Sequence, residues 1–144
     1  MYISFARALR LAVGSRRERP SNFIPDDGVP QTVLEVKDAK AFRAQVLEAK
    51  EPTVVLFWAT WCPFCRRYKP EFDKLAAQRP WRFASVYLDD ESNPLWDDYA
   101  VDVVPTLALF RAGQLVDRQD GVLGYGIDRK ATDAFATRVA PGLS

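Results

Sequence analysis

The stretch TVVLFWATWCPFC, residues 53–65, limits the possible folds of this chain more than any other part of its sequence. Its first six residues, TVVLFW, form a continuous apolar run, which is typical of a strand buried on both faces of a sheet. A helix is predicted to follow from about residue 63 to residue 78, with Pro70 as an internal kink. Cys62 and Cys65 therefore lie where a buried strand passes into a helix.

From residue 31 onward the rest of the chain also alternates between strand and helix patterns. Asp38 is placed to cap one helix, and Gly113 to form the tight turn of a hairpin. The other predicted strands are 32–36, 81–88, 105–110 and 115–119, and the other predicted helices are 38–50, 93–100 and 127–140. This order predicts an α/β fold, with a mixed central sheet covered by helices on both faces. The inward face of the last helix is predicted to hold Ile127, Ala131, Ala134, Phe135 and Val139.

Residues 1–30 differ in composition from the rest of the chain. The first 20 residues hold five arginines and one glutamate, a net charge of +4, and residues 21–30 have the prolines, glycine and Asp-Asp pair of a linker. We therefore divide the chain into a basic N-terminal extension and linker, 1–30, and one domain, 31–144. The extension resembles a mitochondrial targeting segment because no acidic residue precedes Glu18, but a docked or inconsequential extension is the simpler interpretation.

Charge and composition exclude several functions. Beyond residue 20, 15 basic residues stand against 18 acidic ones, a net charge of −3, so the clustered basic face of a nucleic-acid-binding protein is not expected. No apolar run approaches the roughly 20 residues of a membrane-spanning helix, so no integral membrane segment is expected. The chain has no histidine, which removes Cys-His catalysis and histidine-ligated metal sites.

The predicted position of Cys62 beside a helix start gives its sulfur a chemical role. Unpaired backbone N–H groups and the positive end of the helix dipole stabilise a thiolate there, and the thiolate is the form that attacks disulfides. Pro63 suits the first helical position. Phe64 keeps its N–H, so Cys62 is expected to accept hydrogen bonds from the N–H groups of Phe64 and Cys65, which would favour a more oxidising couple. Cys62 is thus the expected nucleophile, and Cys65 the resolving thiol that closes back onto it.

Two other uses of the cysteine pair remain open at this point. A structural disulfide across two residues would stabilise the fold little, because so short a loop hardly restricts the unfolded chain. A zinc site needs about four ligands, so two cysteines without histidine would have to be shared with a second copy of the chain. A redox pair needs neither condition, and we expect no metal.

Together these residues resemble the thioredoxin family. The matching features are the signature Trp-Ala-x-Trp-Cys-x-x-Cys at 58–65, the helix-kinking Pro70, Asp89 after a strand, VVPT at 103–106 with the family's cis-proline at Pro105, and a last hairpin with Gly113 and Gly121. The resemblance covers about residues 31–140. It implies a thioredoxin fold with an extra N-terminal segment.

The resemblance also implies an enzyme that reduces protein disulfides. Its partners would be client proteins with disulfides and a thioredoxin reductase or another dithiol as electron donor, without a specified oligomeric state. It would use no cofactor other than the redox-active disulfide of Cys62 and Cys65. The residues that would shape the site or bind clients are Trp58, Trp61, Pro63, Phe64, Val104 and Pro105. Trp61 would be an exposed platform, and a cis-Pro105 would leave the Val104 backbone free to pair with a client strand.

Three departures from the family pattern affect this interpretation. Leu56 occupies the position where the family usually has a buried aspartate, and Ser85 replaces the lysine that often accompanies it. The residues between the cysteines are Pro-Phe, closer to the glutaredoxin style. An oxidase or isomerase is therefore an alternative, as is an adaptor that binds partners with redox chemistry secondary. The expected location is the cytoplasm, with an organelle as the alternative if residues 1–20 are a targeting segment.

Overall fold

The computed structural model describes residues 33–143, and the N-terminal extension predicted at 1–30 lies outside the described residues. The described strands form one sheet in the order β2-β4-β3-β5-β6. They are β2 (Leu34–Val36), β3 (Thr53–Trp58), β4 (Arg82–Tyr87), β5 (Thr106–Arg111) and β6 (Gln114–Asp120). β2, β4 and β3 are parallel, whereas β5 and β6 each run antiparallel to their neighbour. The predicted mixed sheet is confirmed.

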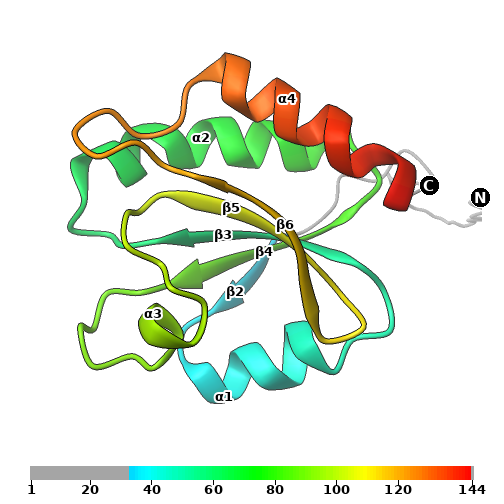
Figure 1. Cartoon of the computed structure of the whole chain (residues 1–144), viewed down its shortest axis with the longest axis horizontal. Helices are drawn as coiled ribbons and strands as arrows, with labels where there is room; N and C mark the ends of the chain where they lie inside the picture. Colours follow the sequence, from blue (N-terminus) through cyan, green and yellow to red (C-terminus); the bar gives the residue numbers. More distant parts are fainter. Residues whose placement is uncertain (1–32, 144) are drawn as a thin grey trace, which may run out of the picture. The chain divides into compact units, whose positions relative to one another are not determined.

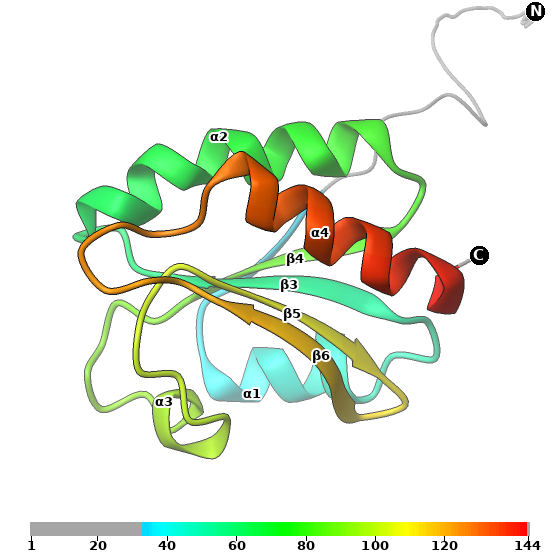
Figure 2. The same ribbon diagram turned by 45° about the horizontal axis from the view of Figure 1, so that its top comes forward.

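Helices cover both faces of this sheet. α2 and α4 lie on one face, and α1 and α3 lie on the other (Figure 1 and Figure 2). The helices are α1 (Ala39–Phe42), α2 (Pro63–Gln78), α3 (Leu95–Asp98) and α4 (Arg129–Val139), with a π-helical continuation of α1, η1 (Arg43–Leu47), and a 3-10 turn, η2 (Ala140–Gly142). Among the described residues, no helix has the length and apolar character needed to cross a membrane.

Local capping signals position two of these helices. Asp38 caps α1 as predicted, because its carboxylate accepts a hydrogen bond of 2.7 Å from the N–H of Ala41. Asp128 caps α4 in the same way, accepting from Ala131 at 2.7 Å. The first helix differs from the single helix expected over 38–50, because its backbone becomes π-helical from Arg43 onward.

The central strand β3 is buried along its whole length, as its sequence predicted. Successive side chains of a strand point to opposite faces, so β3 contributes to both layers of the core. Phe57 packs against Phe42 of α1, with ring centroids 5.9 Å apart. Trp58 points to the other layer, where the Lys69 ammonium of α2 lies 5.6 Å from its ring centroid. The end of β3 is therefore fixed from both sides.

The inward face of α4 differs from the prediction at three residues. Phe135 and Val139 are buried as expected, but Ala134 is exposed, and Thr132 and Ala136 are buried instead. The Thr132 hydroxyl on this buried face pairs with the Tyr68 hydroxyl of α2, 2.7 Å away. A polar side chain with a buried partner thus takes the place that the apolar pattern assigned to alanine.

Candidate active site

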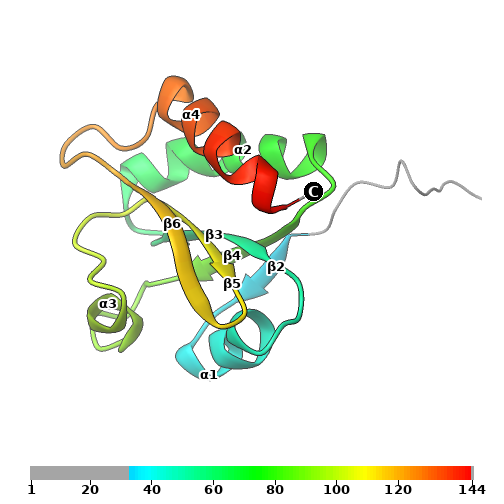
Figure 3. The ribbon, with the colours of Figure 1, turned by 45° about the vertical axis from the view of Figure 1, so that its right-hand side comes forward.

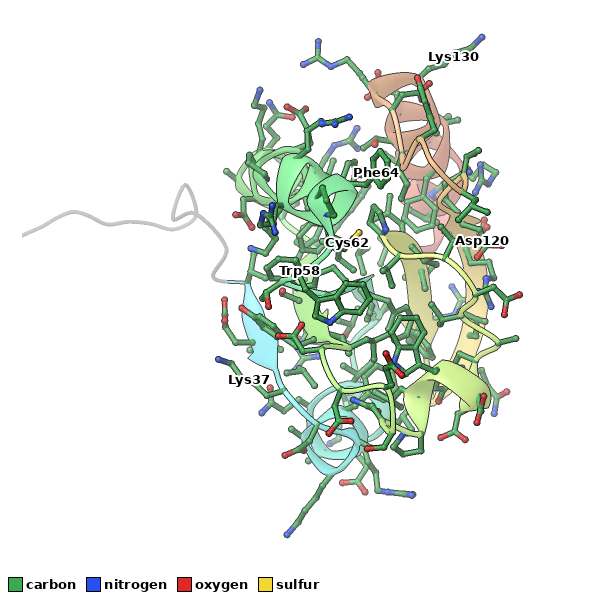
Figure 4. The ribbon with its side chains drawn as sticks, turned by 90° about the vertical axis from the view of Figure 1, so that its left-hand side faces the viewer. Lys37, Trp58, Cys62, Phe64, Asp120 and Lys130 are labelled. Carbon is green, nitrogen blue, oxygen red and sulfur yellow. The ribbon has the colours of Figure 1, made fainter. Side chains whose placement is uncertain are left out.

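The sheet is twisted (Figure 3), and the site lies at one edge of it. The parallel strands β3 and β4 end at this edge, where β5 begins and β6 ends. Four connecting segments therefore meet there although they are far apart in sequence: 59–62, 88–94, 101–105 and 121–128. In Figure 4, Cys62 lies at this end of the molecule, with Phe64 on one side of it and Trp58 on the other.

Cys62 is the residue that caps the N-terminus of α2, and Pro63 begins the helix as predicted. Its backbone N–H donates to the carbonyl of Ala59 at 3.2 Å, which closes a turn between β3 and α2. Its side chain makes no capping hydrogen bond to α2, so the bonds expected from the N–H groups of Phe64 and Cys65 are not formed in this reduced state. The thiol instead points to the carbonyl oxygen of Val104, 3.7 Å from its Sγ.

The two thiols differ in accessibility. Cys62 is 6% exposed, whereas Cys65 has no exposed surface. Burial raises the pKa of the Cys65 thiol well above its usual range. The backbone N–H of Ala59 opposes this shift, while the hydrogen bond and charge of Cys62 and the charge of Asp89 add to it. Cys65 is therefore protonated near neutral pH and shielded from large reactants.

Val104 lies against Cys62, and the peptide bond between Val104 and Pro105 is cis. Both residues are buried. The family resemblance implied a Val104 backbone free to pair with a client; in this reduced state its carbonyl accepts the Cys62 thiol. That contact depends on the thiol proton, so forming a thiolate or a mixed disulfide at Cys62 releases the carbonyl. Gly121 packs on the same loop, because a Cβ at Gly121 would lie 2.3 Å from the Pro105 carbonyl oxygen.

Trp61 is 54% exposed next to Cys62, as expected of a platform. Its indole N–H donates to the carbonyl oxygen of Asp89 at 2.9 Å. The Asp89 carboxylate also accepts hydrogen bonds from the N–H and the hydroxyl of Thr60, at 2.8 Å and 2.7 Å. Arg66 of α2 adds a fourth contact, from its Nη1 to the Thr60 carbonyl at 3.1 Å. Asp89 thus holds the loop that carries Trp61 and Cys62.

Trp58 lies buried below this loop and is 7% exposed. Its indole N–H donates to the Ser85 hydroxyl at 2.6 Å, and its ring packs on Tyr87 with centroids 4.9 Å apart. Leu56 is fully buried and pairs in register with Ser85. The usual aspartate and lysine positions of the family are therefore occupied by an apolar side chain and by a hydroxyl that serves Trp58.

Phe64 connects the cysteine pair to the loop before α4. It is half-buried, and its neighbour Arg67 holds a guanidinium 5.4 Å from its ring centroid. Gly126 lies against it so closely that an added Cβ would be 3.3 Å from the Phe64 Cβ. The loop itself exposes large apolar side chains, with Leu123 85% exposed and Tyr125 57% exposed. The strand and helix patterns of the sequence did not predict this surface, although the glycine-rich segment GVLGYG with its apolar residues is a signal for it.

The structure brings all eight predicted site residues to one edge of the sheet. Within residues 33–143, no group of three or more histidine, cysteine, aspartate or glutamate side chains is placed to hold a metal ion. The arrangement is that of thiol-disulfide oxidoreductases with a thioredoxin fold: a Cys-x-x-Cys pair at a helix start, beside a cis-proline loop.

Comparison with known proteins gives the same result. Residues 32–131 match the family model described as Thioredoxin. The chain is 35% identical over 99 residues to a thioredoxin of Mycobacterium tuberculosis, covering 68% of this chain and 84% of that protein. It is 37% identical over 92 residues, 63% of this chain, to a bifunctional thioredoxin reductase/thioredoxin of Mycobacterium leprae, of whose length it covers 20%. A crystal structure of Chlamydomonas reinhardtii thioredoxin f2 superimposes with a TM-score of 0.64 at 26% identity, over 76% of this chain and 98% of that one. The chain belongs to the thioredoxin family.

Proposed function

We propose that this protein reduces the disulfides of client proteins, with Cys62 as nucleophile and Cys65 as resolving thiol. The observation that supports these roles is the unequal burial of the two thiols. Cys62 is 6% exposed at the start of α2, whereas Cys65 is fully enclosed and its pKa is raised. A client disulfide therefore meets Cys62 first.

The reaction transfers two electrons in two exchange steps. The Cys62 thiolate attacks one sulfur of the client disulfide, the client S–S bond breaks, and a mixed disulfide forms while the other client sulfur leaves as a thiolate and takes up a proton. Cys65 then loses its proton and attacks the Cys62 sulfur. The second client thiol is released, and the Cys62–Cys65 disulfide holds the oxidised state. A dithiol donor restores the two thiols.

The second step is expected to be the slower one here. Cys65 must lose its proton from a buried position, and Leu56 replaces the carboxylate that would help to remove it. Water or the departing client thiolate then has to accept the proton. The mixed disulfide would therefore be long-lived. A long-lived mixed disulfide would also suit the alternative function of an adaptor that binds partners.

The name of the Mycobacterium leprae relative joins a thioredoxin reductase and a thioredoxin in one protein. We infer that this chain also takes electrons from a thioredoxin reductase or from another dithiol. We further propose that it works in a reducing compartment such as the cytoplasm, because a dithiol that donates electrons has to be kept reduced.

The decisive measurement is the reduction potential of the Cys62–Cys65 couple in glutathione redox buffers, together with the turnover of a disulfide-bonded client. A potential near about −270 mV and turnover that is lost in Cys62→Ser support a reductase. A potential of roughly −180 to −120 mV indicates an oxidase or isomerase instead. If Cys62→Ser keeps its partners and the wild type shows no turnover, the protein is an adaptor. The matched variant Cys65→Ser should accumulate the mixed disulfide.

A further inference from the structure

A cavity of about 320 Å³ opens beside the cysteine pair, between the first turns of α2 and the loop that precedes α4. Figure 1 and Figure 2 both show this loop, in orange, alongside the N-terminal end of α2. Phe64 forms one wall, and Tyr125 and Ile127 form the other. The volume is at the lower end of the range for small-ligand sites, so it suits one long side chain rather than a large molecule.

The cavity is lined by Phe64, the residue that separates Cys65 from Pro63 and Cys62 in sequence. Phe64 stands between Cys62 and Cys65 in sequence, and the Gly126 backbone packs directly on it. An occupant of the cavity therefore contacts a residue that lies two positions after Cys62 in the chain. The exposed side chains of Val122 and Leu123, 59% and 85% exposed, continue the apolar surface beyond the cavity. This extent favours a peptide segment over an isolated small molecule.

The charged groups of the cavity are two carboxylates, of Glu71 and Asp128, and one guanidinium, of Arg67. The Asp128 carboxylate accepts a hydrogen bond from the N–H of Ala131 at 2.7 Å and one from the Tyr125 hydroxyl at 3.1 Å. These donors, the backbone N–H first, lower the pKa of Asp128, so it is ionised at neutral pH. Arg67 is engaged over the Phe64 ring, 5.4 Å from its centroid. Glu71 lies 3.7 Å from the Nζ of Lys74, but both side chains are about half exposed, so this pair contributes little and leaves the carboxylate accessible. The lining itself holds one more carboxylate than guanidinium and therefore favours a cation.

From these features we propose that the cavity is a specificity pocket for a lysine or arginine side chain of the client, close in sequence to the cysteine that is attacked. The apolar stem of such a side chain would lie between Phe64 and Ile127, with its charged end at Glu71 and Asp128. The ring faces of Phe64 and Tyr125 would attract the same cation. This inference rests on the proposed disulfide reduction and specifies the client that the same site prefers.

The test uses the full chain and a series of disulfide-linked peptides that differ in one residue. A lysine is placed at successive positions on either side of the cysteine, and each peptide is matched by one with norleucine at that place, which keeps the stem and removes the charge. We expect kcat/KM for the lysine peptide to exceed that of its norleucine partner by roughly fivefold for at least one position. The preference should decrease as the salt concentration rises.

Two isosteric variants locate the effect. Glu71→Gln and Asp128→Asn should each reduce the ratio of lysine to norleucine rates, and asparagine keeps the cap of α4. Glu48→Gln is the matched control, because Glu48 is exposed at the end of η1, in the helix layer on the opposite face of the sheet. It makes the same change in net charge and should leave the ratio unchanged.

The outcomes separate the two proposals. Equal rates for lysine and norleucine at every position overturn the pocket but leave the reductase function standing. A preference that Glu48→Gln reduces as much as Glu71→Gln also overturns it, because the effect is then one of overall charge. No reduction of any peptide overturns the reductase function, and the pocket inference with it.

Discussion

The buried thiol of Cys65 should make the reduced protein lose stability as the pH rises above about 9. The ordinary pKa of a cysteine thiol is 9.0, and burial raises that of Cys65 well above this value in the folded protein. In the unfolded chain the thiol is exposed to water and titrates near the ordinary value. The unfolded state therefore binds fewer protons than the folded state above that pH, and alkali favours unfolding. This stabilisation is complete below the unfolded-state pKa and is lost as the pH rises toward the folded-state pKa.

The size of the effect follows from one proton. If Cys65 stays protonated in the folded protein and has a pKa of 9.0 when unfolded, raising the pH from about 8 to about 10 lowers the free energy of unfolding by about 1.4 kcal/mol. Tyr68, whose pKa burial raises to about 12, adds a smaller loss over the same range. That loss does not involve the cysteine, so a variant without the Cys65 thiol retains it.

The assay is urea unfolding of the reduced protein, monitored by tryptophan fluorescence, at both pH values for the wild type and for Cys65→Ser. The serine hydroxyl does not titrate in this range. The wild type should lose about 1.4 kcal/mol more than the variant between the two pH values. The oxidised protein, in which neither thiol can titrate, should resemble the variant. Equal losses in wild type and variant would show that Cys65 titrates normally, and would refute the argument from its burial.

Two further changes test the surroundings of the pair. Gly121→Ala forces a Cβ to 2.3 Å from the Pro105 carbonyl oxygen, so urea unfolding should show a loss of about 1–3 kcal/mol and client reduction should slow. Gly124→Ala is the control, because a Cβ at Gly124 would meet no atom within 4 Å although the φ there is +78°. It should cost only about 1 kcal/mol of backbone strain and should not slow client reduction. Equal slowing by both variants would contradict the steric argument. Ser85→Ala leaves the buried indole N–H of Trp58 without its 2.6 Å partner and should cost about 1–3 kcal/mol. In a double-mutant cycle, Trp58→Phe should remove most of that cost, and strictly additive effects would show that the bond contributes nothing.

The sequence predicted the elements of this fold where the signals were local. The bounds of α2, from Pro63 to Gln78, agree with the prediction because a proline suited to a first helical turn follows an uninterrupted apolar strand. The Asp38 cap and the hairpin turn at Gly113, with a φ of +78°, are local signals of the same kind. The position of Cys62 between a buried strand and a helix start was likewise predicted from neighbouring residues, and it is confirmed.

The predictions were wrong or incomplete where contacts between segments far apart in sequence determine the structure. The buried face of α4 includes Thr132, whose hydroxyl pairs with that of Tyr68, 64 residues away in sequence. The Cys62 sulfur was expected to accept hydrogen bonds from the first N–H groups of α2, but its thiol contacts Val104, 42 residues away. The cavity beside Phe64 is formed by a loop whose glycines and apolar residues show no periodicity, so a pattern of strands and helices does not reveal it.

The sheet register shows which residues lie beside Leu56, the position that lacks the family's usual carboxylate. Glu35, Ser85 and Leu56 are opposite one another on three neighbouring strands, and directly opposite residues share a face. The acidic member of this row is thus Glu35, which is exposed on the edge strand, where it accepts a hydrogen bond of 2.5 Å from Tyr87. The member of this row on β3, the strand that leads to Cys62, is the apolar Leu56. The rate of the resolving step should therefore rise with pH, because the proton of Cys65 has to leave without help from a carboxylate at position 56.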